Sequence, residues 1–194
     1  MPKDTRARIV EAATALVRER GLGALSVRSV ASAAGLAPTT LRGYFPSQAQ
    51  LYSAVASEFV SVTLSDQRVH DEEVSPVERL HECMRQFLPE PKGARTALEG
   101  WFEYYRLSFG AEGNTAVREL LVAGRHASLS SIEGWLTVLA QQGHRCRRGI
   151  PQTAAGLLSV IDGLHLSMLA DPELLSIDDA HDVLRDHVSA SLHA

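Results

Sequence analysis

The stretch from Val27 to Phe45, VRSVASAAGLAPTTLRGYF, restricts the fold of this chain more than any other. Its apolar residues recur at helical spacing before and after Gly35. A glycine at the end of a helix adopts the left-handed backbone conformation without a Cβ clash. Pro38 suits the first turn of a following helix, where the N–H that it lacks would have no intrahelical partner. The pattern predicts a helix-turn-helix, an arrangement that places its second helix in a DNA groove.

The two helices of this motif leave polar side chains facing outward, because Leu41 and either Tyr44 or Phe45 anchor the second helix from below. Arginine binds phosphates or the edge of guanine, and threonine can contact the methyl group of thymine. A short basic arm at the start of the chain offers contacts to phosphates or to the minor groove, with a solvated terminus as the alternative. The predicted DNA contacts are Arg28, Thr39, Thr40, Arg42 and Tyr44 in the motif, and Lys3 and Arg6 in the arm.

The distribution of charge fits DNA binding better than the total does. The whole chain carries a formal net charge of −4, which by itself argues against a nucleic-acid partner. Residues 1–50, however, hold seven Lys and Arg against three Asp and Glu, a net charge of +4 that leaves −8 on the remainder. A basic head on an acidic body lets the head bind phosphates while the body stays off the DNA.

Hydrophobic periodicity and cap residues predict an all-α fold of about nine helices, with no strand. Besides the motif, the predicted helices span residues 4–20, 47–68, 75–88, 94–109, 115–142, 153–169 and 176–192. We divide the chain into a helix-turn-helix domain at 1–47 and a helical effector-binding and dimerisation domain at 48–194. We see no signal peptide and no apolar run of membrane-spanning length, which predicts a cytoplasmic protein without a membrane partner. Neither a cofactor nor a metal site is predicted.

Three stretches, RIVEAATALVRERG, LSVRSVASAAGLAPTTLRGYF and PSQAQLY, resemble the DNA-binding domain of the TetR family of transcriptional regulators. The resemblance implies a homodimer that binds double-stranded DNA at a palindromic operator, acts as a repressor and responds to a small-molecule effector. It also implies dimerisation through the last two helices, about 153–169 and 177–192. The chain departs from the family at Arg42, Gly43 and Gln48, where the family commonly has tyrosine, a bulky residue and lysine. Gln48 keeps a hydrogen-bond donor, so we include it among the predicted DNA contacts.

The second half of the chain holds candidates for an effector pocket. Aromatic side chains with a carboxylate nearby suit a cationic or aromatic ligand, although such a cluster is more often core. The predicted lining is Trp101, Phe102, Glu103, Tyr105, Phe109, His126, Trp135, Asp162 and His165.

Three alternatives remain at this point. Asp162 and His165 form a candidate catalytic pair for a small helical enzyme, but no nucleophile or metal spacing accompanies them, so we predict no catalytic residue. A regulator that activates, or that needs no ligand, is a second alternative, and a nonspecific DNA-binding protein is a third. The roles of Cys83 and Cys146 are open, because the arginines beside Cys146 would lower its thiol pKa and make it a candidate redox sensor.

Overall fold

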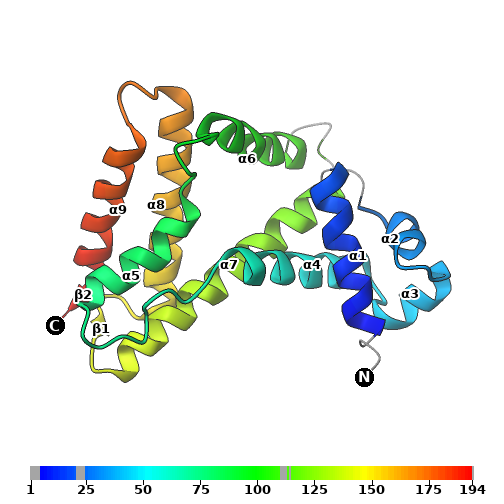
Figure 1. Ribbon diagram of the computed structural model, residues 1–194, viewed down its shortest axis with the longest axis horizontal. Helices are drawn as coiled ribbons and strands as arrows, with labels where there is room; N and C mark the ends of the chain where they lie inside the picture. Colours follow the sequence, from blue (N-terminus) through cyan, green and yellow to red (C-terminus); the bar gives the residue numbers. More distant parts are fainter. Residues whose placement is uncertain (1–4, 21–24, 110–112, 114, 194) are drawn as a thin grey trace. The chain divides into compact units, whose positions relative to one another are not determined.

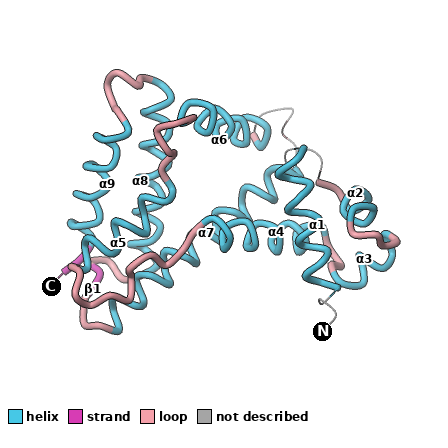
Figure 2. Tube along the Cα trace, in the orientation of Figure 1, coloured by secondary structure: helices cyan, strands magenta, loops and turns pink. Residues whose placement is uncertain are grey.

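The computed structural model describes residues 5–20, 25–109, 113 and 115–193, apart from the side chains at positions 18, 20, 59–62 and 116. Within these residues the fold is all-α, as predicted, with nine α-helices joined by short loops (Figures 1 and 2). The helices are α1 (Thr5–Arg20), α2 (Val27–Ala33), α3 (Pro38–Tyr44), α4 (Gln48–Thr63), α5 (Pro76–Met84), α6 (Ala94–Ser108), α7 (Thr115–Gln141), α8 (Ile150–Ala170) and α9 (Ile177–Ser191), with a 3-10 turn, η2 (Arg85–Phe87), after α5.

The prediction that the chain has no strand is wrong at one place. Two-residue strands, β1 (Arg145–Cys146) and β2 (Leu192–His193), pair in antiparallel register and are drawn in magenta in Figure 2. Leu192 ends α9 with an extended backbone and a buried side chain. Its backbone N–H still donates to Ser189 of α9, and the N–H of Arg147, in the loop after α7, donates to the backbone oxygen of Ser191 at 3.1 Å.

The chain forms two compact units that do not follow the division drawn from the sequence. Unit 1 comprises Met1–Thr63 and Tyr104–Ala127, and unit 2 comprises Leu64–Glu103 and Ser128–Ala194. The chain therefore passes between the units after α4, within α6 and within α7. Each unit has its own apolar core, and Leu120 of α7 belongs to the core of unit 1. The functional division at residue 47 stays a prediction.

The helix-turn-helix in unit 1 forms for the reasons that the sequence suggests. Ser26 caps α2 in a reciprocal capping box with Ser29, which satisfies backbone N–H groups that have no intrahelical partner. Gly35 in the turn has φ of +67°, in the left-handed region that glycine tolerates. Pro38 occupies the first turn of α3. Leu41 is fully buried beneath α3, so this short helix is fixed by packing rather than by its length.

Helix α4 ends at Thr63, five residues earlier than predicted. The backbone after it turns away from the helix, and Gln67 has a left-handed φ of +45°. Ser65 bonds instead to the side chain of Gln86. No glycine or proline follows Thr63 before Pro76, so the sequence offered no local stop signal at this point.

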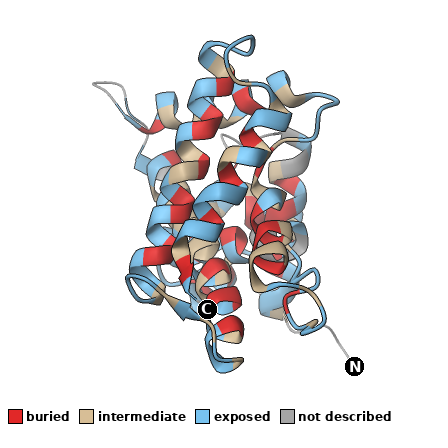
Figure 3. Cartoon of the chain, turned by 90° about the vertical axis from the view of Figure 1, so that its left-hand side faces the viewer, coloured by how far each residue is buried: buried red, intermediate tan, exposed pale blue. Residues whose placement is uncertain are grey.

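Unit 2 packs α5, α8 and α9 together with the adjoining parts of α6 and α7. Buried positions recur along these helices with exposed ones between them (Figure 3). Helix α8 is long and apolar enough to cross a membrane by length and composition alone, but much of its length is buried in the core. Several polar side chains share this core, among them Arg79, His81 and His165.

Candidate DNA interface and effector site

The predicted DNA-contacting residues of the motif are exposed. Arg28 on α2 and Thr39, Thr40 and Arg42 on α3 are open to solvent, and Tyr44 is 42% exposed. Directly beneath them lie buried apolar side chains, including Val30 and Leu41. The two helices therefore present polar groups from a fixed scaffold, which is the geometry that a recognition surface needs.

The described part of the basic arm lies in the first turn of α1, and its role as a DNA contact stays a prediction. Arg6 lies within α1, with its guanidinium 4.9 Å from the centroid of the Phe45 ring. Arg8 donates to the backbone oxygen of Ala34 at 3.2 Å and so ties α1 to the end of α2. The predicted contact at Lys3 lies outside the described residues. Arg6 thus covers the aromatic residue that ends α3, a cation–π contact that also keeps its charge near the motif.

Gln48 anchors the start of α4. Its amide donates to the hydroxyl of Tyr52, and Tyr52 in turn donates to the backbone oxygen of Leu25 at 3.1 Å. Gln48 is itself exposed, and it can donate a second amide hydrogen outward. Its role as a DNA contact stays a prediction, while its structural role is to hold the loop before α2 against α4.

In unit 2 the structure brings together two of the predicted effector residues that are distant in sequence. The rings of Trp101 and His165 meet edge to face with centroids 5.0 Å apart. The Nε2 atom of His165 lies 2.9 Å from the backbone oxygen of Phe87 and therefore donates to it, because a carbonyl can only accept. The other ring nitrogen, Nδ1, is buried without a hydrogen-bond partner in the part of the chain that the structure describes. Burial lowers the pKa of His165, so the imidazole is held neutral.

The indole of Trp135 lies nearby in the same core. It meets Phe87 edge to face at 6.2 Å and donates from Nε1 to the carboxylate of Asp66 at 2.9 Å. Trp101, His165, Phe87 and Trp135 thus form a continuous aromatic cluster, which we call the aromatic core cluster. Asp162 is half-buried one turn before His165, close enough for its charge to act on that ring.

The other predicted effector residues lie outside the aromatic core cluster. In unit 2, Phe102 and Glu103 are exposed. In unit 1, Tyr105 and Phe109 meet with ring centroids 6.2 Å apart, and Arg125 donates to the Tyr105 hydroxyl at 2.8 Å. His126 is exposed on α7. The helical spacing placed these residues near one another in sequence but could not show which side of α6 each would occupy.

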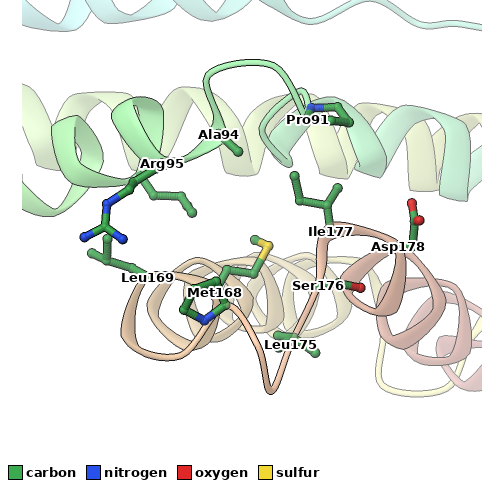
Figure 4. Close-up of a pocket in the computed structure, with 11 residues that line it drawn as sticks. Pro91, Ala94, Arg95, Met168, Leu169, Leu175, Ser176, Ile177 and Asp178 are labelled. Carbon is green, nitrogen blue, oxygen red and sulfur yellow. The ribbon is translucent and has the colours of Figure 1, made fainter.

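A pocket of about 440 Å³ opens in unit 2, and none of the predicted residues lines it. Figure 4 shows Arg95 and Asp178 at opposite ends of the pocket, with Met168 between them. Met168 and Leu98 form a buried apolar floor. They lie one helical turn from His165 and Trp101, so the pocket is adjacent along α6 and α8 to the aromatic core cluster. Only folding brings its two lining segments together, so no local sequence pattern could predict it.

The two cysteines lack the environment of a reactive thiol. Burial raises the pKa of Cys83 to about 12, and its thiol donates to the backbone oxygen of Asp66. Burial also raises the pKa of Cys146. The expectation that neighbouring arginines lower the Cys146 pKa is therefore wrong, because Arg145 and Arg147 are exposed to solvent, which screens their charge.

Comparisons with known proteins agree with this geometry. Residues 9–55 match the family described as "Bacterial regulatory proteins, tetR family", and residues 76–193 match "BetI-type transcriptional repressor, C-terminal". The HTH-type transcriptional regulator BetI of Rhizobium meliloti (strain 1021) is 25% identical over 97% of this chain and 90% of its own length. The regulator PksA of Bacillus subtilis (strain 168) is 24% identical over 95% and 88%, respectively. A transcriptional regulator from Saccharomonospora viridis, solved in complex with choline, shares the fold with a TM-score of 0.58 at 22% identity, covering 97% of this chain and 98% of that one.

Proposed function

Because this chain belongs to the TetR family of transcriptional regulators, we propose that it is a ligand-responsive repressor that binds a palindromic operator as a homodimer. The observation that carries the proposal is the exposed polar face of α3 above a fully buried Leu41. A short helix fixed by packing presents Thr39, Thr40 and Arg42 in a constant geometry, as sequence-specific base contacts require. Such a protein acts where the chromosome is, in the cytoplasm.

The outer face of α8 supports the homodimer. Leu166 is 51% exposed, and the small residues Gly156, Ser159 and Gly163 are exposed on the same helix. An apolar helix with small side chains on its free face allows a second helix to approach closely. One recognition helix reads too few base pairs to locate a site in a genome, whereas two held about one DNA turn apart read a palindrome. We therefore assign the dimer interface to α8 and α9, where two helices from each subunit form a four-helix bundle.

The DNA-binding part is tested by footprinting the purified chain on genomic DNA and measuring affinity for the recovered site. We expect protection of a palindrome and a particle of twice the chain mass in light scattering. The variant Leu166→Glu should be monomeric and lose affinity for the palindrome while keeping its helicity. A chain that binds random duplexes as tightly as the recovered site would contradict the proposal and favour a nonspecific DNA-binding protein.

For the effector we propose a small organic cation that carries a hydroxyl or N–H group. The aromatic faces of Trp101 and Trp135 attract cations, and the carboxylate of Asp162 lies close to His165. A donor on the ligand would satisfy the unpartnered Nδ1 of His165. The adjacent pocket provides volume for an apolar body. The choline complex of the Saccharomonospora viridis regulator makes choline the first compound to try.

The effector part is tested by titrating choline while following tryptophan fluorescence and operator affinity. We expect saturable quenching and release from the operator, and we expect His165→Phe to weaken choline binding. A ligand shifts the two-state equilibrium only by its differential affinity for the two states, so a 100-fold loss of operator affinity needs about 2.7 kcal/mol of coupling. Binding of choline that leaves operator affinity unchanged would contradict its role as effector.

A further inference from the structure

The backbone that follows α4 is held by a single glutamine of η2. The Oε1 atom of Gln86 accepts from the backbone N–H of Ser65 at 2.9 Å and from its hydroxyl at 3.1 Å. The Nε2 atom of Gln86 donates to the backbone oxygen of Ser65 at 2.8 Å. The side chain of Gln86 thus bonds to both the backbone N–H and the backbone oxygen of Ser65. These bonds replace the helical hydrogen bonds that would have continued α4.

The next residue, Asp66, is held from two directions. Its carboxylate accepts the indole N–H of Trp135 on α7, and its backbone oxygen accepts the thiol of Cys83 on α5. Trp135 is almost fully buried, so its donor position is fixed by the core. A hydrogen bond to a charged acceptor is stronger than one between neutral groups, and this one joins the exposed segment to the interior of unit 2.

Two further contacts complete the attachment. Arg68 pairs with Glu82, and Arg79 donates to the backbone oxygen of Val69 at 3.0 Å. Between them, Gln67 adopts a left-handed φ of +45°, which a non-glycine residue keeps only when its surroundings impose it. Residues 65–69 are therefore fixed to unit 2 although they form no helix or strand of their own.

This attachment lies where the chain leaves α4. Of the three places where the chain passes between units, two lie inside the continuous helices α6 and α7. The third, after Thr63, leads into residues 65–69, which the side-chain contacts described above hold within unit 2. We infer that Asp66, Gln86 and Trp135 are positioning residues for operator binding, which hold residues 65–69 in place directly after α4. The inference rests on the proposed function and extends it to residues that do not touch DNA.

The same contacts connect this segment to the proposed effector site. Phe87, directly after Gln86, meets Trp135 edge to face and accepts a hydrogen bond from His165 through its backbone oxygen. A ligand that displaces His165 acts on both the neighbour of Gln86 and the ring of Trp135. Residues 65 and 66 are thus connected, through Trp135 and Phe87, to the aromatic core cluster.

The test compares operator affinity with affinity for a random duplex of equal length, and measures hydrogen exchange at residues 65–69. Asp66→Ala removes the acceptor at an exposed position, where the fold tolerates the change, and Trp135→Phe keeps a ring but removes the donor. We expect both variants to lose operator affinity about fivefold and to exchange faster at residues 65–69, with unchanged affinity for the random duplex. Loss of stability alone would lower both affinities together.

Two further variants serve as matched controls. Asp66→Asn keeps an oxygen acceptor but removes its charge, so it should lose less operator affinity than Asp66→Ala does. Thr137→Val removes a hydrogen bond of α7 that is internal to the helix, from Thr137 to the backbone oxygen of Glu133, and should change neither measurement. Faster exchange with an unchanged operator-to-random ratio would overturn the inference, as would unchanged exchange in both test variants. If the wild type bound the operator and the random duplex equally, the proposed function would be refuted, and the inference about Asp66, Gln86 and Trp135 with it. Hydrogen exchange at residues 65–69 is measured without DNA, so it distinguishes a failure of the inference from a failure of the proposed function.

Discussion

The two units differ in where they keep their polar side chains. Among the described residues of unit 1, the buried polar side chains are hydroxyl groups, Thr14 and Ser108, and the arginines of the motif are exposed. Unit 2 buries a guanidinium, Arg79, and two imidazoles, His81 and His165. A buried charged or titratable group costs free energy unless it is bonded, so a fold that keeps one holds it in a fixed place.

This difference separates two kinds of functional residue. In unit 1 the polar groups of the motif, such as Arg28 and Arg42, are exposed to an external partner, and an apolar core fixes the backbone that carries them. In unit 2 the polar groups bind other parts of the same chain, such as the loop after α4 and the end of η2. Substitutions in unit 1 should therefore alter binding without altering stability, whereas substitutions of the buried groups in unit 2 should alter stability first.

The largest effect on stability is expected at Arg79. It donates from Nη1 to the Val69 backbone oxygen and to the Gln142 side chain at 2.7 Å, and it is only 1% exposed. Arg79→Ala leaves both acceptors without a donor and creates a cavity, so we expect a loss of about 3 kcal/mol in the free energy of unfolding, measured by urea denaturation. Arg95→Ala, which removes an exposed arginine paired with Glu99, should cost less than about 0.5 kcal/mol. Equal losses in the two variants would show that burial of Arg79 contributes nothing.

The second effect concerns binding alone. Arg42→Ala should weaken operator affinity at least about tenfold, equivalent to about 1.4 kcal/mol, with unchanged helicity, because Arg42 is exposed on α3. Anisotropy titrations at several salt concentrations distinguish its two possible targets. If Arg42 contacts a phosphate, its removal lowers the slope of log affinity against log salt concentration by about one; if it contacts a guanine, its removal relaxes specificity at one base pair. The control variant Arg145→Ala, which replaces an exposed arginine of unit 2, should leave operator affinity unchanged. An equal loss of operator affinity in this variant would contradict the assignment of Arg42 as a DNA contact.

The same contrast explains what the sequence could predict. The capping box at Ser26, the left-handed Gly35 and the first-turn Pro38 act within a few residues, so local pattern was enough to locate α2 and α3. The contacts that define unit 2 join residues far apart, 69 positions for Asp66 with Trp135 and 78 for Phe87 with His165. Periodicity shows which side of a helix is apolar but not which distant side chain meets it. The early end of α4, the pocket and the small β-sheet depend on such pairings.

The third effect is a dependence of stability on pH that arises in unit 2. Burial lowers the pKa of His81, and the nearby Arg185 lowers it further, while the neighbouring Glu78 opposes the shift. Burial also lowers the pKa of His181, whose ring meets that of His81 edge to face. The unfolded chain then binds protons at a higher pH than the folded chain does. Stability therefore falls as pH decreases below about 6.5, by at most about 1.4 kcal/mol per pH unit for each histidine.

Replacement of His81 tests this origin. His81→Leu removes one titrating group from the core and should reduce the slope of unfolding free energy against pH between about 6.5 and 5. The matched variant His126→Gln removes an exposed histidine of unit 1 and should leave the slope unchanged. If acid lowered the stability of the wild type and of His81→Leu equally, the dependence on pH would arise from groups other than His81.

The smallest effect is expected at Cys146, and it bears on the remaining regulatory alternative. Burial raises the pKa of this thiol, so little thiolate is present near neutral pH, and oxidation by peroxide requires the thiolate. The arginines around it are exposed and act through solvent, where their field is screened. Cys146→Ser should therefore match the wild type in operator affinity within about twofold, both in reductant and after brief exposure to hydrogen peroxide. If peroxide released the wild type but not Cys146→Ser from the operator, a side chain of unit 2 would respond to an external reagent. The difference between exposed polar groups in unit 1 and internally bound ones in unit 2 would then hold for hydrogen-bonded groups alone.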